Sequence, residues 1–122
     1  MSAVAVLCAL VTVLSSQPAS AAMAVSGSCQ FTPGKWKLTV DRYDATRLRV
    51  IFAIRSGEPG SSWQLFGSDN GHPFVTKYKT ADQFGIVRVR WRPLDRAGSD
   101  LIEAAGSESS PSTNTCSGRL TF

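Results

Sequence analysis

Three arginines stand at every second position within the segment FGIVRVRWRPLDRAGSD, residues 84–100. They are Arg88, Arg90 and Arg92, and the residues between them are apolar. Because residues two apart in a β-strand share a face, a strand here would carry a row of guanidinium groups on one side. Such a row can bind the phosphate or carboxylate groups of a polyanion. It is also typical of the solvated face of a soluble sheet, where basic side chains discourage edge pairing, and we favour this second interpretation.

Neighbouring strands could enlarge the basic row by bringing further cations to the same face, either Lys77 and Lys79 or Arg47 and Arg49. The polyanion hypothesis requires five basic side chains to form one exposed patch, and their placement on different sheets would exclude it. The five are Arg88, Arg90, Arg92, Lys77 and Lys79. A nucleic-acid surface also needs aromatic rings on that face to stack on bases, whereas Trp91 alternates to the opposite face. We therefore expect a cell-wall polymer, rather than nucleic acid, as the polyanion.

No residue pattern indicates catalysis. His72 is the only histidine and directly precedes Pro73 in a segment rich in turn residues. A general base needs a nucleophile or water in reach and a third group that orients it. The sequence contains no nucleophile elbow, metal-binding histidine pattern or phosphate-binding loop. We therefore predict no catalytic, cofactor-binding or metal-binding residues, and interpret His72 as a solvated turn residue.

The nine acidic residues are scattered over turns and strand ends. Asp69 with Asn70 does not have the spacing of a calcium-binding loop. Asp95, Asp100 and Glu103 could cluster, but turn capping accounts for the two aspartates. An enzyme with an unfamiliar site remains an alternative to the non-catalytic interpretation.

Residues 1–21 are typical of a secretory signal peptide, although no basic residue precedes the apolar run. This run, Val4–Leu14, is too short to span a bilayer, which needs about 20 residues. Ala19 and Ala21 supply the small side chains required for cleavage after Ala21. The sequence therefore predicts a mature domain, residues 22–122, that is secreted or associated with the cell envelope and is not inserted in the membrane.

The cysteines also indicate export. Cys8 lies in the predicted signal peptide, which leaves Cys29 and Cys116 near the two ends of the mature domain. In an oxidising compartment this pair predicts one disulfide. Two distant cysteines and one histidine make no zinc site, and no Cys-x-x-Cys motif indicates redox activity.

Short segments of period-2 alternation follow one another between turn residues, so the mature domain is expected to be all-β. The expected strands are 35–40, 46–54, 62–66, 74–79, 85–91, 101–105 and 118–122. About seven antiparallel strands predict a single immunoglobulin-like β-sandwich. Its predicted inward-facing side chains are Trp36, Leu38, Val40, Leu48, Val50, Phe52, Ile54, Trp63, Leu65, Val87, Val89, Trp91 and Leu120. The cysteine positions differ from the usual immunoglobulin bridge, and we expect the disulfide to join the leading segment to the last strand.

Three predicted loops are candidate binding sites, since domains of this kind commonly carry function on loops of a rigid scaffold. They are Ser56–Ser62, Gly67–Pro73 and Gly106–Thr115. Within the second, Asn70–Gly71 is the preferred pair for a tight hairpin turn. The third is polar and low in complexity, and is expected to be mobile. An inhibitor of a secreted hydrolase would instead need a rigid, protruding loop there.

Several features follow one another from the first cysteine onward: WKL at 36–38, RLRVIFAI at 47–54, SWQLF at 62–66 before Asn70–Gly71, RAGSD at 96–100, and SGRL after Cys116. By these features, the chain resembles a group of small secreted actinobacterial proteins of unknown function that have an immunoglobulin-type β-sandwich. The resemblance covers about residues 29–122. The chain departs from the group in its longer SESSPSTNT loop and its uncharged leader. The resemblance implies export and a fold, and it supplies no catalytic residue.

Together these features predict a secreted, non-catalytic domain that acts by surface recognition, as a monomer and without a cofactor. Its net charge of +4 favours solubility and weak attraction to anionic surfaces. The expected partner is an extracellular protein or a cell-wall polymer. The alternatives are a polyanion binder that uses the basic row and an inhibitor of a secreted hydrolase.

Overall fold

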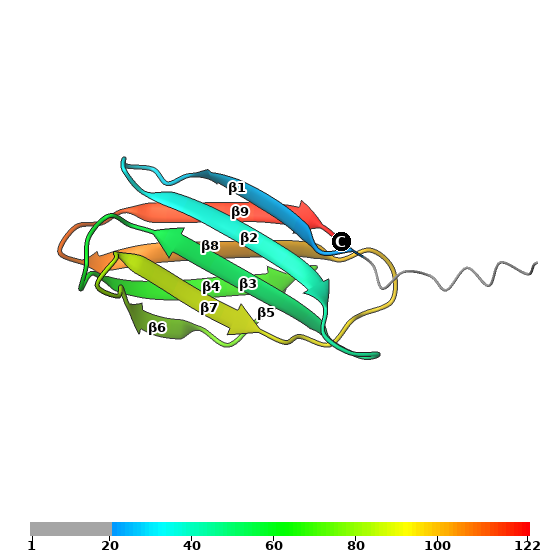
Figure 1. The fold of residues 1–122 in the computed structure, drawn as a ribbon. Coiled ribbons are helices and arrows are strands. Elements are labelled where there is room, and N and C mark those ends of the chain that lie inside the picture. The colour runs from blue at the N-terminus through cyan, green and yellow to red at the C-terminus, as the bar shows by residue number, and fades with distance from the viewer. Residues whose placement is uncertain (1–20) are drawn as a thin grey trace, which may run out of the picture.

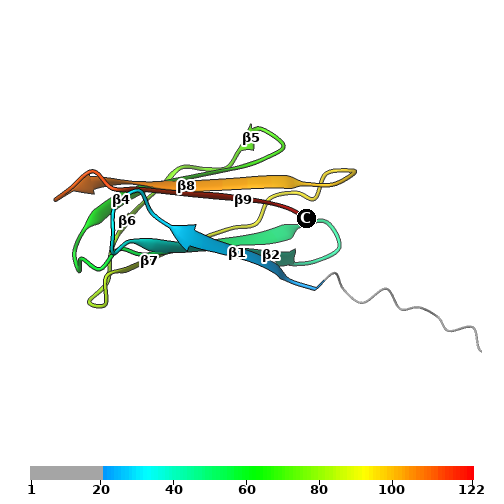
Figure 2. The same cartoon turned by 90° about the horizontal axis from the view of Figure 1, so that it is seen from above.

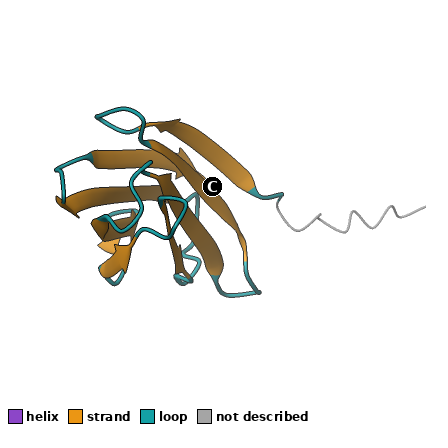
Figure 3. Ribbon diagram, turned by 60° about the vertical axis from the view of Figure 1, so that its left-hand side comes forward, coloured by secondary structure: helices purple, strands orange, loops and turns teal. Residues whose placement is uncertain are grey.

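A computed structural model describes residues 21–122 of the chain. The regular secondary structure of these residues consists of β-strands (Figure 3). Apart from Ala21, the predicted signal peptide lies outside the described residues. No segment of the described range forms a helix that could cross a membrane.

The nine strands of this range form two antiparallel sheets that pack face to face (Figures 1 and 2). The four-stranded sheet has the order β1-β2-β3-β7, and its strands are Met23–Ser28, Lys35–Arg42, Leu48–Arg55 and Ile86–Trp91. The five-stranded sheet has the order β5-β4-β8-β9, with strands His72–Pro73, Ser62–Asp69, Leu101–Ser110 and Thr115–Thr121. Its fifth strand, β6 (Lys77–Thr80), pairs with β4. The predicted all-β sandwich is therefore confirmed.

The order of strand pairing is that of an immunoglobulin-like sandwich. Strands β2, β3 and β7 pair in the order of the A, B and E strands, and β4, β8 and β9 in the order of the C, F and G strands. Residues 21–122 contain two strands more than the seven expected. β1 was missed because its sequence MAVSGS is short of large apolar residues, and β5 is only two residues long.

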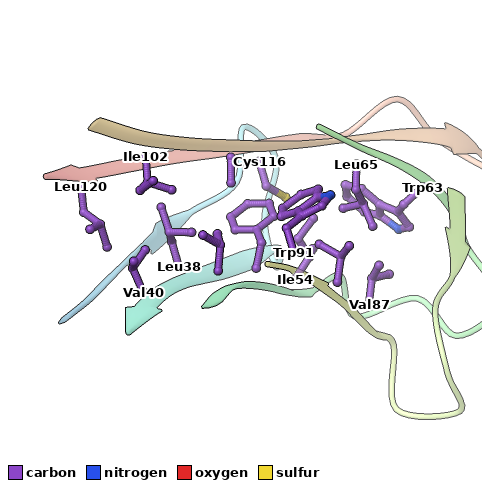
Figure 4. Close-up of a cluster of buried hydrophobic side chains, with 14 of the residues drawn as sticks. Leu38, Val40, Ile54, Trp63, Leu65, Val87, Trp91, Ile102, Cys116 and Leu120 are labelled. Atoms are coloured by element: carbon purple, nitrogen blue, oxygen red, sulfur yellow. The ribbon is translucent and has the colours of Figure 1, made fainter. Parts of the chain in front are cut away.

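The predicted core is confirmed. Twelve of the thirteen predicted inward-facing side chains are buried, and Trp36 is half-buried against them. Ile102, Ala104 and Ala81 complete the core, and side chains from both sheets meet between the two layers (Figure 4). Full burial of one large apolar side chain contributes about 1.5–3 kcal/mol to folding, so this layer holds the two sheets together.

The predicted disulfide is also confirmed. Cys29 directly follows β1 and is bonded to Cys116 in β9 with an S–S distance of 2.06 Å. Because β1 and β9 belong to different sheets, the bridge joins the two layers as well as the two ends of the domain.

The predicted hairpin turn lies between β4 and β5. Asn70 and Gly71 have φ angles of 49° and 82°, and Asp69 pairs with His72 across the turn. Two consecutive residues with positive φ define the tight turn whose twist matches that of the flanking strands, and this is the conformation that Asn-Gly favours.

The prediction of a mobile loop at Gly106–Thr115 is wrong. β8 continues to Ser110 and β9 begins at Thr115, so only four residues connect the two strands. The inward positions in this part of β8 are occupied by Gly106 and Glu108 rather than by large apolar residues. A Cβ atom at Gly106 would lie 2.3 Å from the Cδ1 atom of Ile54, so any other residue there would displace the buried Ile54 side chain. The usual apolar alternation is therefore lost although the strand continues.

The strand expected at 74–79 is also shorter than predicted, since it begins at Lys77. The backbone N–H of Phe74 donates to the carbonyl oxygen of Gly67, 2.7 Å away, and the Trp91 indole N–H donates to the carbonyl of Val75 at 2.8 Å. This segment therefore bonds to its surroundings without joining a ladder, and it leads the chain from β5 to the edge strand β6.

Candidate anion-binding site

The alternation predicted around the arginine row is confirmed by β7. Val87, Val89 and Trp91 are buried, whereas Arg88 and Arg90 are exposed on the outer face of the four-stranded sheet. Arg92 directly follows the strand and is exposed. Its guanidinium carbon lies 4.3 Å from the centre of the Tyr43 ring, a cation–π contact that holds the side chain in place.

Lys77 and Lys79 lie on the other sheet. Strand β6 belongs to the five-stranded sheet, where Lys77 and Lys79 stand opposite Leu65 and Trp63 of β4. They therefore point to the inner side of that sheet. Strand β6 lies at the edge of its sheet, next to β7 of the facing sheet (Figures 1 and 2). Lys77 is half-buried there and Lys79 is exposed, so neither charged group enters the core.

The expectation that placement on different sheets would exclude a single basic patch is therefore wrong. The same hollow, with a volume of about 550 Å³, is lined by all five basic residues. The Nζ atom of Lys77 donates to the carbonyl oxygen of Arg90 at 3.2 Å and ties the two edge strands together. The expectation failed because it treated each sheet as a separate surface, although edge strands of facing sheets lie side by side.

Other cations extend the basic surface over the four-stranded sheet. Lys37 stands opposite Ala53 of β3, and Ala53 stands opposite Arg88 of β7. Lys35 of β2 likewise stands opposite Arg55 of β3. All of these residues share the outer face because their neighbours in sequence point into the core.

The only carboxylate on the four strands of this sheet is Asp41, which forms an ion pair with Arg49. The only other ion pair among residues 21–122 joins Arg42 to Asp95, with an N–O distance of 2.7 Å. The hollow between β6 and β7 is lined by no carboxylate. Its cations therefore face solvent with an uncompensated positive field, which attracts anions. Arg47 and Arg49, the other pair proposed from the sequence, do not line the hollow.

The hollow presents no aromatic ring on which a base could stack. Trp91 is 5% exposed and packs with Phe74 at a ring-centre distance of 5.3 Å. Tyr43 stacks with the Arg92 guanidinium. The site therefore offers charge and hydrogen-bond donors without the stacking platforms typical of single-stranded nucleic-acid sites.

Two of the predicted binding loops are internally braced. In the loop after β3, the Ser56 hydroxyl donates to the carbonyl of Gly85 and the Ser61 hydroxyl donates to the carbonyl of Glu58, each at 2.8 Å. Ser61 in turn accepts the indole N–H of the buried Trp63. In the connection between β8 and β9, Asn114 is buried. The side chains of Ser56, Ser61 and Asn114 therefore stabilise the fold of these loops.

A pair of buried acids was missed by sequence reasoning. Asp69 is 1% exposed and Asp100 is 2% exposed, and no hydrogen-bond donor other than a protonated Asp100 reaches the carboxylate oxygens of Asp69. Burial, followed by the hydrogen bond and charge of Asp69 and then those of Asp95, raises the pKa of Asp100 from 3.8 to about 7. A proton on Asp100 thus supplies a donor between the two acids. The sequence offered only the possible cluster of Asp95, Asp100 and Glu103, and Glu103 is instead exposed on the outer face of β8.

The remaining candidates for chemistry are dispersed. His72 is exposed on the short strand β5. No group of three or more His, Cys, Asp or Glu side chains within residues 21–122 is arranged to hold a metal ion. Comparison of the chain with protein-family models, curated proteins and solved structures gave no match. The resemblance to secreted actinobacterial proteins therefore stays a prediction.

Proposed function

We propose that the chain is an exported, non-catalytic interaction domain that binds a polyanion outside the cell through the basic hollow between β6 and β7. The observation that carries this proposal is the convergence of Arg88, Arg90, Arg92, Lys77 and Lys79 on one hollow that is lined by no carboxylate. Phosphate and carboxylate groups are the complementary chemistry. A cell-wall polymer is favoured over nucleic acid, because the hollow has no ring for base stacking. The disulfide and the signal-like leader support export.

A binding assay with a soluble polyanion tests this proposal. We expect long-chain inorganic polyphosphate to bind at low salt and to dissociate as salt rises, because binding releases counterions. Arg88→Gln and Lys79→Gln should each weaken binding about three- to fivefold, as expected for one exposed charge contact. Each should also reduce the slope of log affinity against log salt concentration by about one.

Arg119→Gln is the matched control. It removes one exposed charge from β9, on the outer face of the five-stranded sheet, and should leave polyphosphate affinity nearly unchanged. Equal weakening by Arg88→Gln, Lys79→Gln and Arg119→Gln would show that only net charge matters, and would contradict a site between β6 and β7.

A further inference from the structure

A second hollow adjoins the basic one and is largely apolar. It has a volume of about 300 Å³, at the lower end of small-molecule sites, which are roughly 300–1,000 Å³. Its lining includes Phe74, Val75, Trp91 and Leu94, together with the exposed polar residues His72 and Arg96. Asp69 also contributes to the lining, but its carboxylate oxygens are buried.

Two aliphatic side chains in this hollow are unusually exposed. Val75 is 76% exposed and Leu94 is 53% exposed. Scattered exposed apolar residues are common on proteins, but these two line the same pocket together with the Phe74–Trp91 ring pair. Apolar surface gathered in this way marks a binding site for an apolar group.

The walls of the apolar pocket are held by hydrogen bonds to backbone carbonyl groups. The indole N–H of Trp91 donates to the carbonyl oxygen of Val75 at 2.8 Å, and the backbone N–H of Leu48 donates to the carbonyl of Pro93 at 2.9 Å. Because Val75 and Pro93 both line the pocket, it is formed before any ligand arrives. Pre-formed walls reduce the entropy lost on binding.

The two hollows share part of their lining, since Val75, Trp91 and Arg92 belong to both. A chain seated between Val75 and Leu94 would therefore have its end next to Arg92 and the cations beyond it. We infer that the basic site takes an amphiphilic anion, an alkyl or acyl chain that ends in a phosphate or carboxylate, with the chain in the apolar pocket and the head group in the basic hollow. This inference rests on the proposed function, because it places the head group in the same basic site.

A comparison of decyl phosphate with butyl phosphate, both kept below their micelle-forming concentrations, tests the inference by calorimetry. A buried methylene is worth about 0.8 kcal/mol, or roughly fourfold in affinity. We therefore expect decyl phosphate to bind at least tenfold more tightly than butyl phosphate. Leu94→Ser and Val75→Ser should remove most of this advantage. Both residues are exposed, so these variants should fold.

Phe84→Ser is the matched control, because Phe84 is 69% exposed in the turn before β7, at the other end of that strand from Trp91. It should leave both alkyl phosphates unaffected. Polyphosphate should bind Leu94→Ser and Phe84→Ser like the unaltered protein, because neither residue lines the basic hollow. Equal affinity for the two alkyl phosphates, or an advantage of decyl phosphate that survives in Leu94→Ser and Val75→Ser, would overturn the inference.

Polyphosphate separates the two proposals. If polyphosphate binds and chain length has no effect, the apolar pocket is not used and the proposed function stands. If polyphosphate does not bind, but decyl phosphate binds and Leu94→Ser weakens that binding, the polyanion proposal fails and the apolar pocket is supported.

Discussion

Asp100 is a buried acid whose pKa is raised by its surroundings. It directly precedes β8 and lies near Asp69, the last residue of β4, and Asp95, whose charge is compensated by Arg42. Its burial raises its pKa to about 7 because the charged form loses hydration and meets a second acid. By contrast, the exposed Asp44 at the turn between β2 and β3 has a lowered pKa, chiefly because the backbone N–H of Thr46 donates to it.

The raised pKa of Asp100 predicts a stability that depends on pH. Between about pH 4 and pH 7 the folded state keeps a proton that the unfolded state has released. The free energy of unfolding should therefore fall as pH rises through this window, by at most about 1.4 kcal/mol per pH unit, and level off above it. Asp100→Asn, whose amide stays neutral, should flatten the profile and be more stable than the unaltered protein at pH 8, by roughly 1–3 kcal/mol. Urea unfolding from pH 4 to pH 9 measures both effects.

Glu103→Gln provides the control for this experiment, because Glu103 is exposed on β8, three residues after Asp100. It should retain the full pH dependence. The assignment to Asp100 would be wrong if Asp100→Asn kept the same slope as Glu103→Gln.

At the scale of elements, the connection between β8 and β9 shows how one polar side chain can order a segment that has no apolar residues. The Oδ1 atom of Asn114 accepts the backbone N–H of Phe31 at 2.9 Å, and its Nδ2 atom donates to the Phe31 carbonyl at 3.0 Å. The turn after β1 and the turn after β8 are thereby joined next to the Cys29–Cys116 bridge. Ser112 adds a 2.7 Å hydrogen bond to the buried Glu108.

Replacement of Asn114 should expose this dependence. Asn114→Ala leaves the partly buried backbone N–H of Phe31 without its acceptor and removes one of the two donors to the Phe31 carbonyl, which should cost about 1–3 kcal/mol of unfolding free energy. Thr113→Ala alters the exposed neighbour and should change it by less than about 0.5 kcal/mol. Urea denaturation gives both values. A loss no larger in Asn114→Ala than in Thr113→Ala would show that the turn is held by the disulfide alone.

At the scale of the whole molecule, the disulfide acts on a small sandwich whose two ends would otherwise separate. The bridge spans 87 positions of sequence, so it restricts the unfolded chain strongly. In the chain-entropy account a loop of this length is worth about 4–5 kcal/mol. The packed core between the sheets supplies the remaining cohesion.

Removal of the bridge should therefore lower the free energy of unfolding by about 3–5 kcal/mol. We expect this loss in the Cys29→Ala/Cys116→Ala double variant, and a similar loss when the unaltered protein is reduced. Urea unfolding with and without reductant measures it. If reduction did not change the unfolding midpoint, the bridge would not contribute to the stability of the domain.

The sequence by itself determined the sandwich, the core and the bridge. Alternation of large apolar and polar residues, as in Val87–Trp91, is a local consequence of strand geometry, and it predicts which side chains are buried without knowledge of the partner strand. Asn70–Gly71 predicted its turn for a similar reason, because the required φ angles are a property of those two residues. The strand predictions failed where the inner positions are not apolar, at Gly106 and Glu108 in β8.

Only the tertiary structure decided which surfaces those strands would form. The cations of β6 and β7 come from different sheets, and they share a hollow because two edge strands lie side by side. Asp69 and Asp100 are likewise far apart in sequence and adjacent in space. Such contacts depend on how strands far apart in the chain are ordered within and between sheets. Periodicity within one segment carries no information about that order.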